Sequence, residues 1–157
     1  MFKNRGAIMK SFKILSLLTV VMAGVAMIAC DAKNMAEQTR TVMEKNLAIM
    51  EEFIDSVEET QDSQVYLSAL QKMKADMERL IPEMNELDKK YPELFKLGVN
   101  KEPSPELQKI MKELLVKEQE IRPKFVAALQ KVMTDANDPE IKEELQKIFE
   151  LQKRLIK

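Results

Sequence analysis

The sequence predicts an all-α protein that folds as an antiparallel helical bundle of about four helices. Its 157 residues include only three glycines, and two of them, Gly6 and Gly24, precede residue 30. Lys, Glu, Leu, Met, Gln and Ala dominate the composition, and their side chains lose little rotamer freedom in a helix. Apolar residues recur three and four positions apart over most of the chain, which places them along one face of each helix.

The first two predicted helices carry the most regular apolar stripes. The first covers roughly residues 34–60, and its stripe comprises Met43, Leu47, Met50, Ile54 and Val57. Asp62 or Ser63 is expected to cap the start of the second. The second stripe has the steps of four and three that are typical of coiled-coil packing, and it comprises Tyr66, Leu70, Met73, Met77, Leu80, Met84, Leu87 and Tyr91. Pro82 lies within this stripe, which continues in phase past it, so we expect a kink rather than a helix end.

Prolines also mark the boundaries of the remaining helices. Lys90 is expected to end the second helix, because the residue before a proline, here Pro92, avoids the α region. Ser104–Glu106 predicts the start of the third helix, which Pro123 is expected to kink, and Asn137–Glu140 repeats the start signal for the fourth. Since the fourth helix is the shortest, one end of the bundle should be only three helices thick.

Residues 1–29 have the pattern of a secretory signal. They contain no acidic residue and four basic ones, Lys3, Arg5, Lys10 and Lys13. The uncharged segment 14–29 is shorter than the roughly 20 residues that a membrane-spanning helix needs, but it fits the apolar region of a signal peptide. Met9 opens a more compact signal, so translation starts at either Met1 or Met9.

The end of this signal, Met27-Ile28-Ala29-Cys30, resembles the lipobox of bacterial lipoproteins. In that family, signal peptidase II cuts before a cysteine that carries a diacylglyceryl group, and leucine is usual at the position of Met27. The resemblance implies that Cys30 is the lipidated, palmitate-bearing first residue of the mature protein. It also implies a location in the cell envelope, with the leaflet open. The helical pattern begins almost at once after Cys30, so we expect a short tether, residues 30–33, before a helical bundle domain of residues 34–157.

Two alternatives to lipidation remain. Residues 1–29 would then be an ordinary cleaved signal or a short uncleaved anchor, with Cys30 incidental. Cys30 is the only cysteine of the chain, so it has no partner for an intramolecular disulfide. A lone thiol is a liability in an oxidising compartment, and lipidation would remove it.

The composition argues against catalysis, cofactors and nucleic acid. The chain has no histidine, which removes the usual general base and most metal sites. Gly98 is the only glycine after residue 29, too few for a phosphate-binding loop. Four of the 25 basic residues precede residue 30 and none of the 26 acidic ones does, so residues 30–157 carry a net charge near −5. We expect no enzyme, no cofactor, no metal and no nucleic-acid partner.

The methionine stripe of the second helix is a candidate groove for a ligand or partner. The candidate residues are Met73, Met77, Met84, Tyr91 and Phe95. Methionine is flexible and polarizable, so such a stripe suits peptides, lipid tails or the soft Cu(I) ion. The alternative is core filling, because a bundle must bury these same positions.

Carboxylates are the abundant reactive groups of the chain. Glu51, Glu52, Asp55, Glu58 and Glu59 cluster near the end of the first helix, but they lie off its apolar stripe. We therefore interpret them as a solvated face rather than a metal site. One further acid, Glu118, interrupts the apolar stripe of the third helix.

These features predict a membrane-tethered, non-catalytic interaction lipoprotein of the bacterial envelope. It would bind a protein or peptide through the open end or a groove of its bundle. One alternative is a carrier that holds a lipid or another small apolar ligand in a methionine-lined interior. Another is a structural lipoprotein that forms homo-oligomers through the long seam of the second helix.

Overall fold

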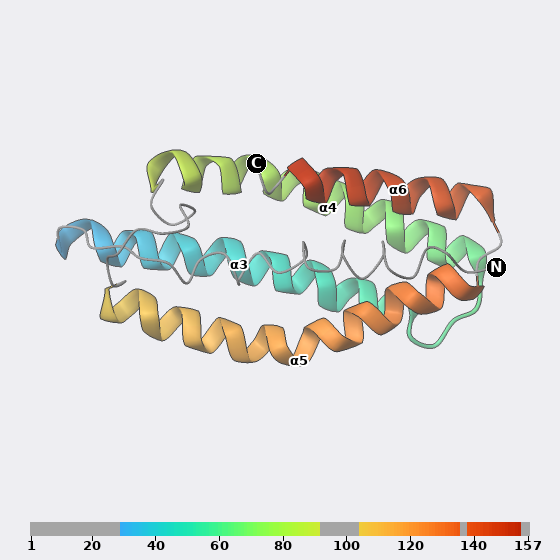
Figure 1. Ribbon diagram of the computed structural model, residues 1–157, viewed down its shortest axis with the longest axis horizontal. Coiled ribbons are helices and arrows are strands. Elements are labelled where there is room, and N and C mark those ends of the chain that lie inside the picture. The colour runs from blue at the N-terminus through green and yellow to red at the C-terminus, as the bar shows by residue number, and fades with distance from the viewer. Residues whose placement is uncertain (1–28, 92–103, 136–137, 155–157) are drawn as a thin grey trace.

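The computed structural model describes residues 29–91, 104–135 and 138–154, and within these residues it contains helices and no strand (Figure 1). The helices are α3 (Ala29–Val57), α4 (Ser63–Lys90), α5 (Pro105–Asp135) and α6 (Pro139–Arg154). The predicted all-α bundle is therefore confirmed. None of the helices in the described part of the chain is both long enough and apolar enough to cross a membrane.

Side-chain caps fix three helix starts where the sequence predicts them. Asp62, Ser104 and Asp138 each accept a hydrogen bond from a backbone N–H two or three residues later, at 2.8, 3.2 and 2.9 Å. Each cap satisfies one of the N–H groups that the first helical turn leaves without an intrahelical partner. The end of α4 at Lys90 also agrees with the prediction.

The start of α3 differs from the prediction. The helix begins at Ala29 rather than near Asn34, and residues 30–33, the predicted tether, belong to it. No glycine or proline occurs in α3, so nothing in the sequence interrupts the helix there. The buried face also extends further back than the predicted stripe, since Met35 and Thr39 are 1% and 0% exposed.

α4 and α5 both run through an internal proline. Pro82 lies inside α4 and Pro123 inside α5, and neither proline ends its helix. Figure 1 shows α5 bent near the middle of its length, the region that contains Pro123. A proline removes one backbone N–H donor and crowds the preceding turn, which accounts for a bend without a break.

The bundle consists of two parallel pairs of helices that run antiparallel to each other (Figure 1). α3 packs against α5 and α4, and α6 packs against α4. α3 and α5 run in the same direction: Arg40 forms an ion pair with Glu113 near their starts, and Lys131 donates to the backbone carbonyl of Val57 near their ends. Helices that follow one another in the chain therefore run antiparallel, as predicted, while α3 and α5 form a parallel contact.

α6 is much shorter than the other helices and covers only about half of α4 (Figure 1). It has 16 residues, whereas α3, α4 and α5 have 29, 28 and 31. One end of the bundle is therefore three helices thick, as predicted. We call it the three-helix end; it holds the start of α3, the end of α4 and the start of α5. The opposite end, where α3 and α5 stop and α4 and α6 begin, is the four-helix end.

A single apolar core lies between the helices. Its largest fully buried side chains include Tyr66, Tyr91 and Phe125. The rings of Phe53 and Phe125 meet edge to face, with centroids 5.5 Å apart. This geometry is favourable for aromatic pairs and joins α3 to α5 within the core.

Candidate functional site

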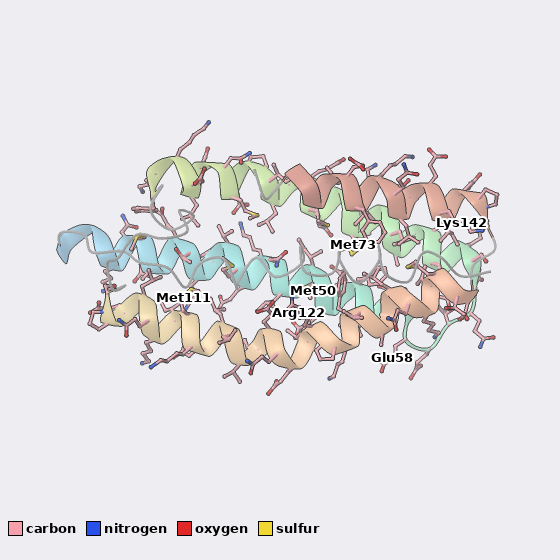
Figure 2. The ribbon with its side chains drawn as sticks, viewed as in Figure 1. Met50, Glu58, Met73, Met111, Arg122 and Lys142 are labelled. Atoms are coloured by element: carbon pink, nitrogen blue, oxygen red, sulfur yellow. The ribbon has the colours of Figure 1, made fainter. Side chains whose placement is uncertain are left out.

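The predicted groove residues of α4 lie inside the bundle. Those that the structure describes share an exposed fraction of 7% or less: Met73, Met77, Met84 and Tyr91. Figure 2 shows Met73 among the side chains between the helices, together with Met50 from α3 and Met111 from α5. Phe95, the remaining candidate, lies outside the described residues. This burial favours the core-filling interpretation over an open methionine groove.

A surface depression of about 460 Å³ lies between α3 and α4 at the three-helix end. We call it the end depression. Two apolar residues, Val42 and Leu87, contribute to its lining. The other lining residues are polar or charged: Asn34, Glu37, Gln38, Thr41, Glu83, Glu86 and Lys90. Polar side chains thus dominate this surface, because Val42 and Leu87 are only 6% and 4% exposed.

Polar contacts within the end depression order its α3 side and join it to α4. The side-chain amide of Gln38 donates to Asn34 at 3.2 Å, and Lys90 Nζ donates to the Gln38 oxygen at 3.2 Å. The Lys90 ammonium also lies 5.3 Å from the centroid of the Tyr91 ring, a cation–π distance. These contacts hold the amide of Gln38 between the two helices, with one polar group on each side of it.

A second depression, of about 350 Å³, continues along the same α3–α4 seam. Glu83 of α4 lines both depressions. Its carboxylate forms an ion pair with Lys45 of α3, at an N–O distance of 2.6 Å. Further along, Lys72 forms an ion pair with Glu52 at 2.7 Å. Hydrogen bonds from Lys72 to two carboxylates raise the pKa of its ammonium. Such exposed pairs contribute at most about 1 kcal/mol each, so the seam is a hydrated surface with a few fixed charges.

Two acidic side chains are buried, and their surroundings differ. Burial raises the pKa of Glu118, and the charge of Arg122, 3.8 Å away, opposes this shift only in part. Burial also acts to raise the pKa of Glu144, but hydrogen bonds from Lys147 and Lys74, at 3.1 and 3.2 Å, outweigh it and lower the pKa. The Glu144 carboxylate thus joins α6 to α4 through its contact with Lys74. The Glu118 carboxylate is buried with only one distant cation, Arg122, beside it.

The described residues offer no metal centre. No group of three or more cysteine, aspartate or glutamate side chains among them is placed to hold a metal ion. The acidic cluster of α3 lies on a solvated face, as predicted, because all five residues are exposed: Glu51, Glu52, Asp55, Glu58 and Glu59. Their only ion pair among the described contacts is that of Glu52 with Lys72.

Sequence reasoning identifies only part of this site. Cys30, the predicted lipidation residue, lies in the first turn of α3, while Met27 and Ile28 fall outside the described residues. Glu118 is visible in the sequence as an interruption of a stripe. The residues of the end depression, such as Glu37 and Glu86, could not be predicted from the sequence. They are charged residues off the apolar stripes, and nothing distinguishes them from other solvated helix positions.

Comparison with known proteins identifies no relative of this chain. The chain matches no protein-family model, no curated protein and no solved structure.

Proposed function

We propose that this chain is a lipid-anchored, non-catalytic binding protein of the bacterial envelope. The observation that carries the proposal is the sequence Met27–Cys30, which follows an uncharged segment and contains the only cysteine of the chain. Each buried methylene of an acyl chain contributes about 0.8 kcal/mol, so two or three chains would hold the protein on the membrane stably.

The partner of this protein is a protein or peptide that contacts the end depression. One feature supports this choice. The lining includes the exposed carboxylates of Glu37 and Glu86, which suit the N–H donors of a peptide and its lysine or arginine side chains. The carrier and self-association alternatives receive less support, because the α4 stripe on which both depend is buried in the bundle.

The anchor is tested by substitution at the lipobox. In cells grown with a labelled fatty acid, the unchanged chain should carry label and sediment with membranes. Cys30→Ser should lose the label and the membrane association, because serine offers no thiol for the diacylglyceryl group. Met27→Leu is the matched control, since it introduces the residue that is usual in the lipobox and should keep the label. Persistent labelling of the serine variant would refute the anchor.

The binding surface is tested by site-specific photo-crosslinking in the same cells. A photoreactive residue in place of Glu37, in the end depression, should give a defined adduct with one envelope protein. The same residue in place of Glu120, which is exposed on α5, is the control and should give none. Glu86→Lys should abolish the Glu37 adduct, because it replaces an acceptor by a cation. Equal adducts from both positions would contradict the proposed surface.

A further inference from the structure

We infer that the anchored bundle stands end-on on the bilayer, with the terminal turns of its three-helix end against the lipid headgroups and its four-helix end projecting into the aqueous phase. The end depression then remains open along the side of the bundle, between α3 and α4. This orientation rests on the proposed lipid anchor at Cys30. At a rise of 1.5 Å per residue, α3 from Cys30 to Val57 measures about 40 Å. The two ends of the bundle would therefore meet very different surroundings.

The segment that connects the anchor to the bundle core is short. Cys30 already lies in the first turn of α3, and Met35 is the first residue of that helix in the core, 1% exposed. The five residues from Cys30 to Met35 span about 7.5 Å as a helix, and only about 17 Å if they were fully extended. Either length is well below that of the bundle, so the anchor keeps the three-helix end beside the membrane.

The topology gathers three chain segments at this anchored end. The start of α3, the end of α4 and the start of α5 lie together there (Figure 1). Both α3 and α5 thus direct their N-termini, with partial positive charge, toward the membrane, and α4 directs its C-terminus, with partial negative charge. The net partial charge of these three helix ends is positive, which is favourable beside the phosphate groups of lipids.

The two ends of the bundle also differ in side-chain charge. In the five residues at each helix end and the described linker residues at the four-helix end, eight residues are acidic and two are basic: Asp55, Glu58, Glu59, Asp62, Asp135, Asp138, Glu140 and Glu143, with Lys131 and Lys142. At the three-helix end, the described side chains in the corresponding five-residue helix ends are three acids and four bases: Glu86, Asp88 and Glu106, with Lys33, Lys89, Lys90 and Lys109. Figure 2 shows Glu58 and Lys142 near the four-helix end. Anionic headgroups repel the first set and tolerate the second.

The sides of the bundle give no reason for it to lie flat. A helix that lies in the headgroup layer inserts an apolar face, usually with large side chains. Among the described residues, the exposed large hydrophobic side chains are Val65 on α4 and Val116 on α5. One valine on each of two helices does not form such a face. Contact along the side of the bundle would therefore bring charged surfaces to the bilayer without burying apolar area.

Depth-dependent fluorescence quenching tests this orientation. The lipidated chain is purified from membranes and placed in vesicles of phosphatidylethanolamine and phosphatidylglycerol, some carrying a quencher on the headgroup. Lys89→Cys and Lys109→Cys label the three-helix end, and Gln61→Cys and Glu140→Cys label the four-helix end. All four positions are exposed. The sulfur of a lipidated Cys30 is blocked, so the fluorophore attaches only to the new cysteine.

We expect several-fold stronger quenching at Lys89→Cys and Lys109→Cys than at the other two variants. The headgroup layer is only about 5–8 Å thick on each side of the bilayer, far less than the length of the bundle. Equal quenching at both ends of an acylated protein would overturn the orientation alone. Mass spectrometry that finds no acyl group on Cys30 of the unsubstituted chain would overturn the proposed anchor, and the orientation with it.

Discussion

Replacing Glu118 by leucine is expected to stabilise the protein at neutral pH by about 1–2 kcal/mol. Glu118 is 5% exposed on the apolar face of α5. Its ion pair with Arg122 spans 3.8 Å, longer than the roughly 2.7–2.9 Å of a charge-assisted hydrogen bond. Apolar replacement of a buried ion pair often stabilises by about 1–4 kcal/mol. We expect the lower part of that range, because the Arg122 side chain is 35% exposed and remains hydrated after the change.

The gain from Glu118→Leu should depend on pH in a defined direction. Burial raises the pKa of this carboxyl above its ordinary value of about 4.5, so the folded state binds the proton more tightly than the unfolded state. The stability of the parent protein therefore falls as the pH rises from that ordinary value through the raised pKa. Leucine does not titrate, so its advantage should be small near pH 4 and should grow as the pH rises through the raised pKa.

Urea unfolding followed by circular dichroism at pH 4 and pH 7 measures the effect. The melting temperature at pH 7 should rise by an amount on the order of 5 °C. Glu120→Leu is the matched control, because Glu120 is exposed on the same helix and its replacement should change stability by no more than about 0.5 kcal/mol. A Glu118→Leu protein less stable than the parent at pH 7 would refute the reasoning, since it would show that favourable contacts hold the carboxylate.

Three further substitutions test other parts of the structure. Glu144→Gln should cost about 1–2 kcal/mol at pH 7 because it weakens the contacts with two lysines. The folded pKa of Glu144 is lowered, so the stability that it contributes is lost as the pH falls through that pKa; urea titrations of variant and parent should converge in acid. Lys131→Ala should cost about 1 kcal/mol in thermal unfolding, because the ammonium donates to two backbone carbonyls at the end of α3, at 2.9 and 2.6 Å. An unchanged melting temperature would contradict this role, and exposed Lys124→Ala is the control. Met77→Ala should cost about 2–5 kcal/mol in urea unfolding if Met77 fills the core, whereas unchanged stability with altered lipid or peptide binding would support the groove.

The helix boundaries that can be predicted from the sequence are those set by residues close to them in the chain. Asp62 and Ser104 cap helices through hydrogen bonds to residues two and three positions away, so the sequence contains the whole interaction. Lys90 ends α4 one residue before the Tyr91–Pro92 pair, another local effect. The first residues of α3 are less predictable, because the apolar stripe is the only guide there and its first regular member, Met43, lies well inside the helix.

The pairing of the helices and the end depression were not predictable from one sequence. Arg40 and Glu113 are separated by 73 positions, and nothing in either neighbourhood specifies that α3 and α5 lie parallel. The same holds for Glu37 and Glu86, which come together only because α3 and α4 meet at a particular register. Periodicity identifies the buried face of each helix, but it does not identify the helix that the face meets.

The limited contact of α6 has a consequence for the order in which the fold opens. α3 packs against two long helices, whereas α6 has extensive packing against α4 alone. Segments with few tertiary contacts open at a lower free energy than the whole molecule. The amide protons of α6 should therefore exchange with solvent faster than those in the middle of α3, through a partial opening that leaves three helices folded. The last helix of the chain would then be a separate cooperative unit, which can detach and re-dock while the rest of the domain stays native.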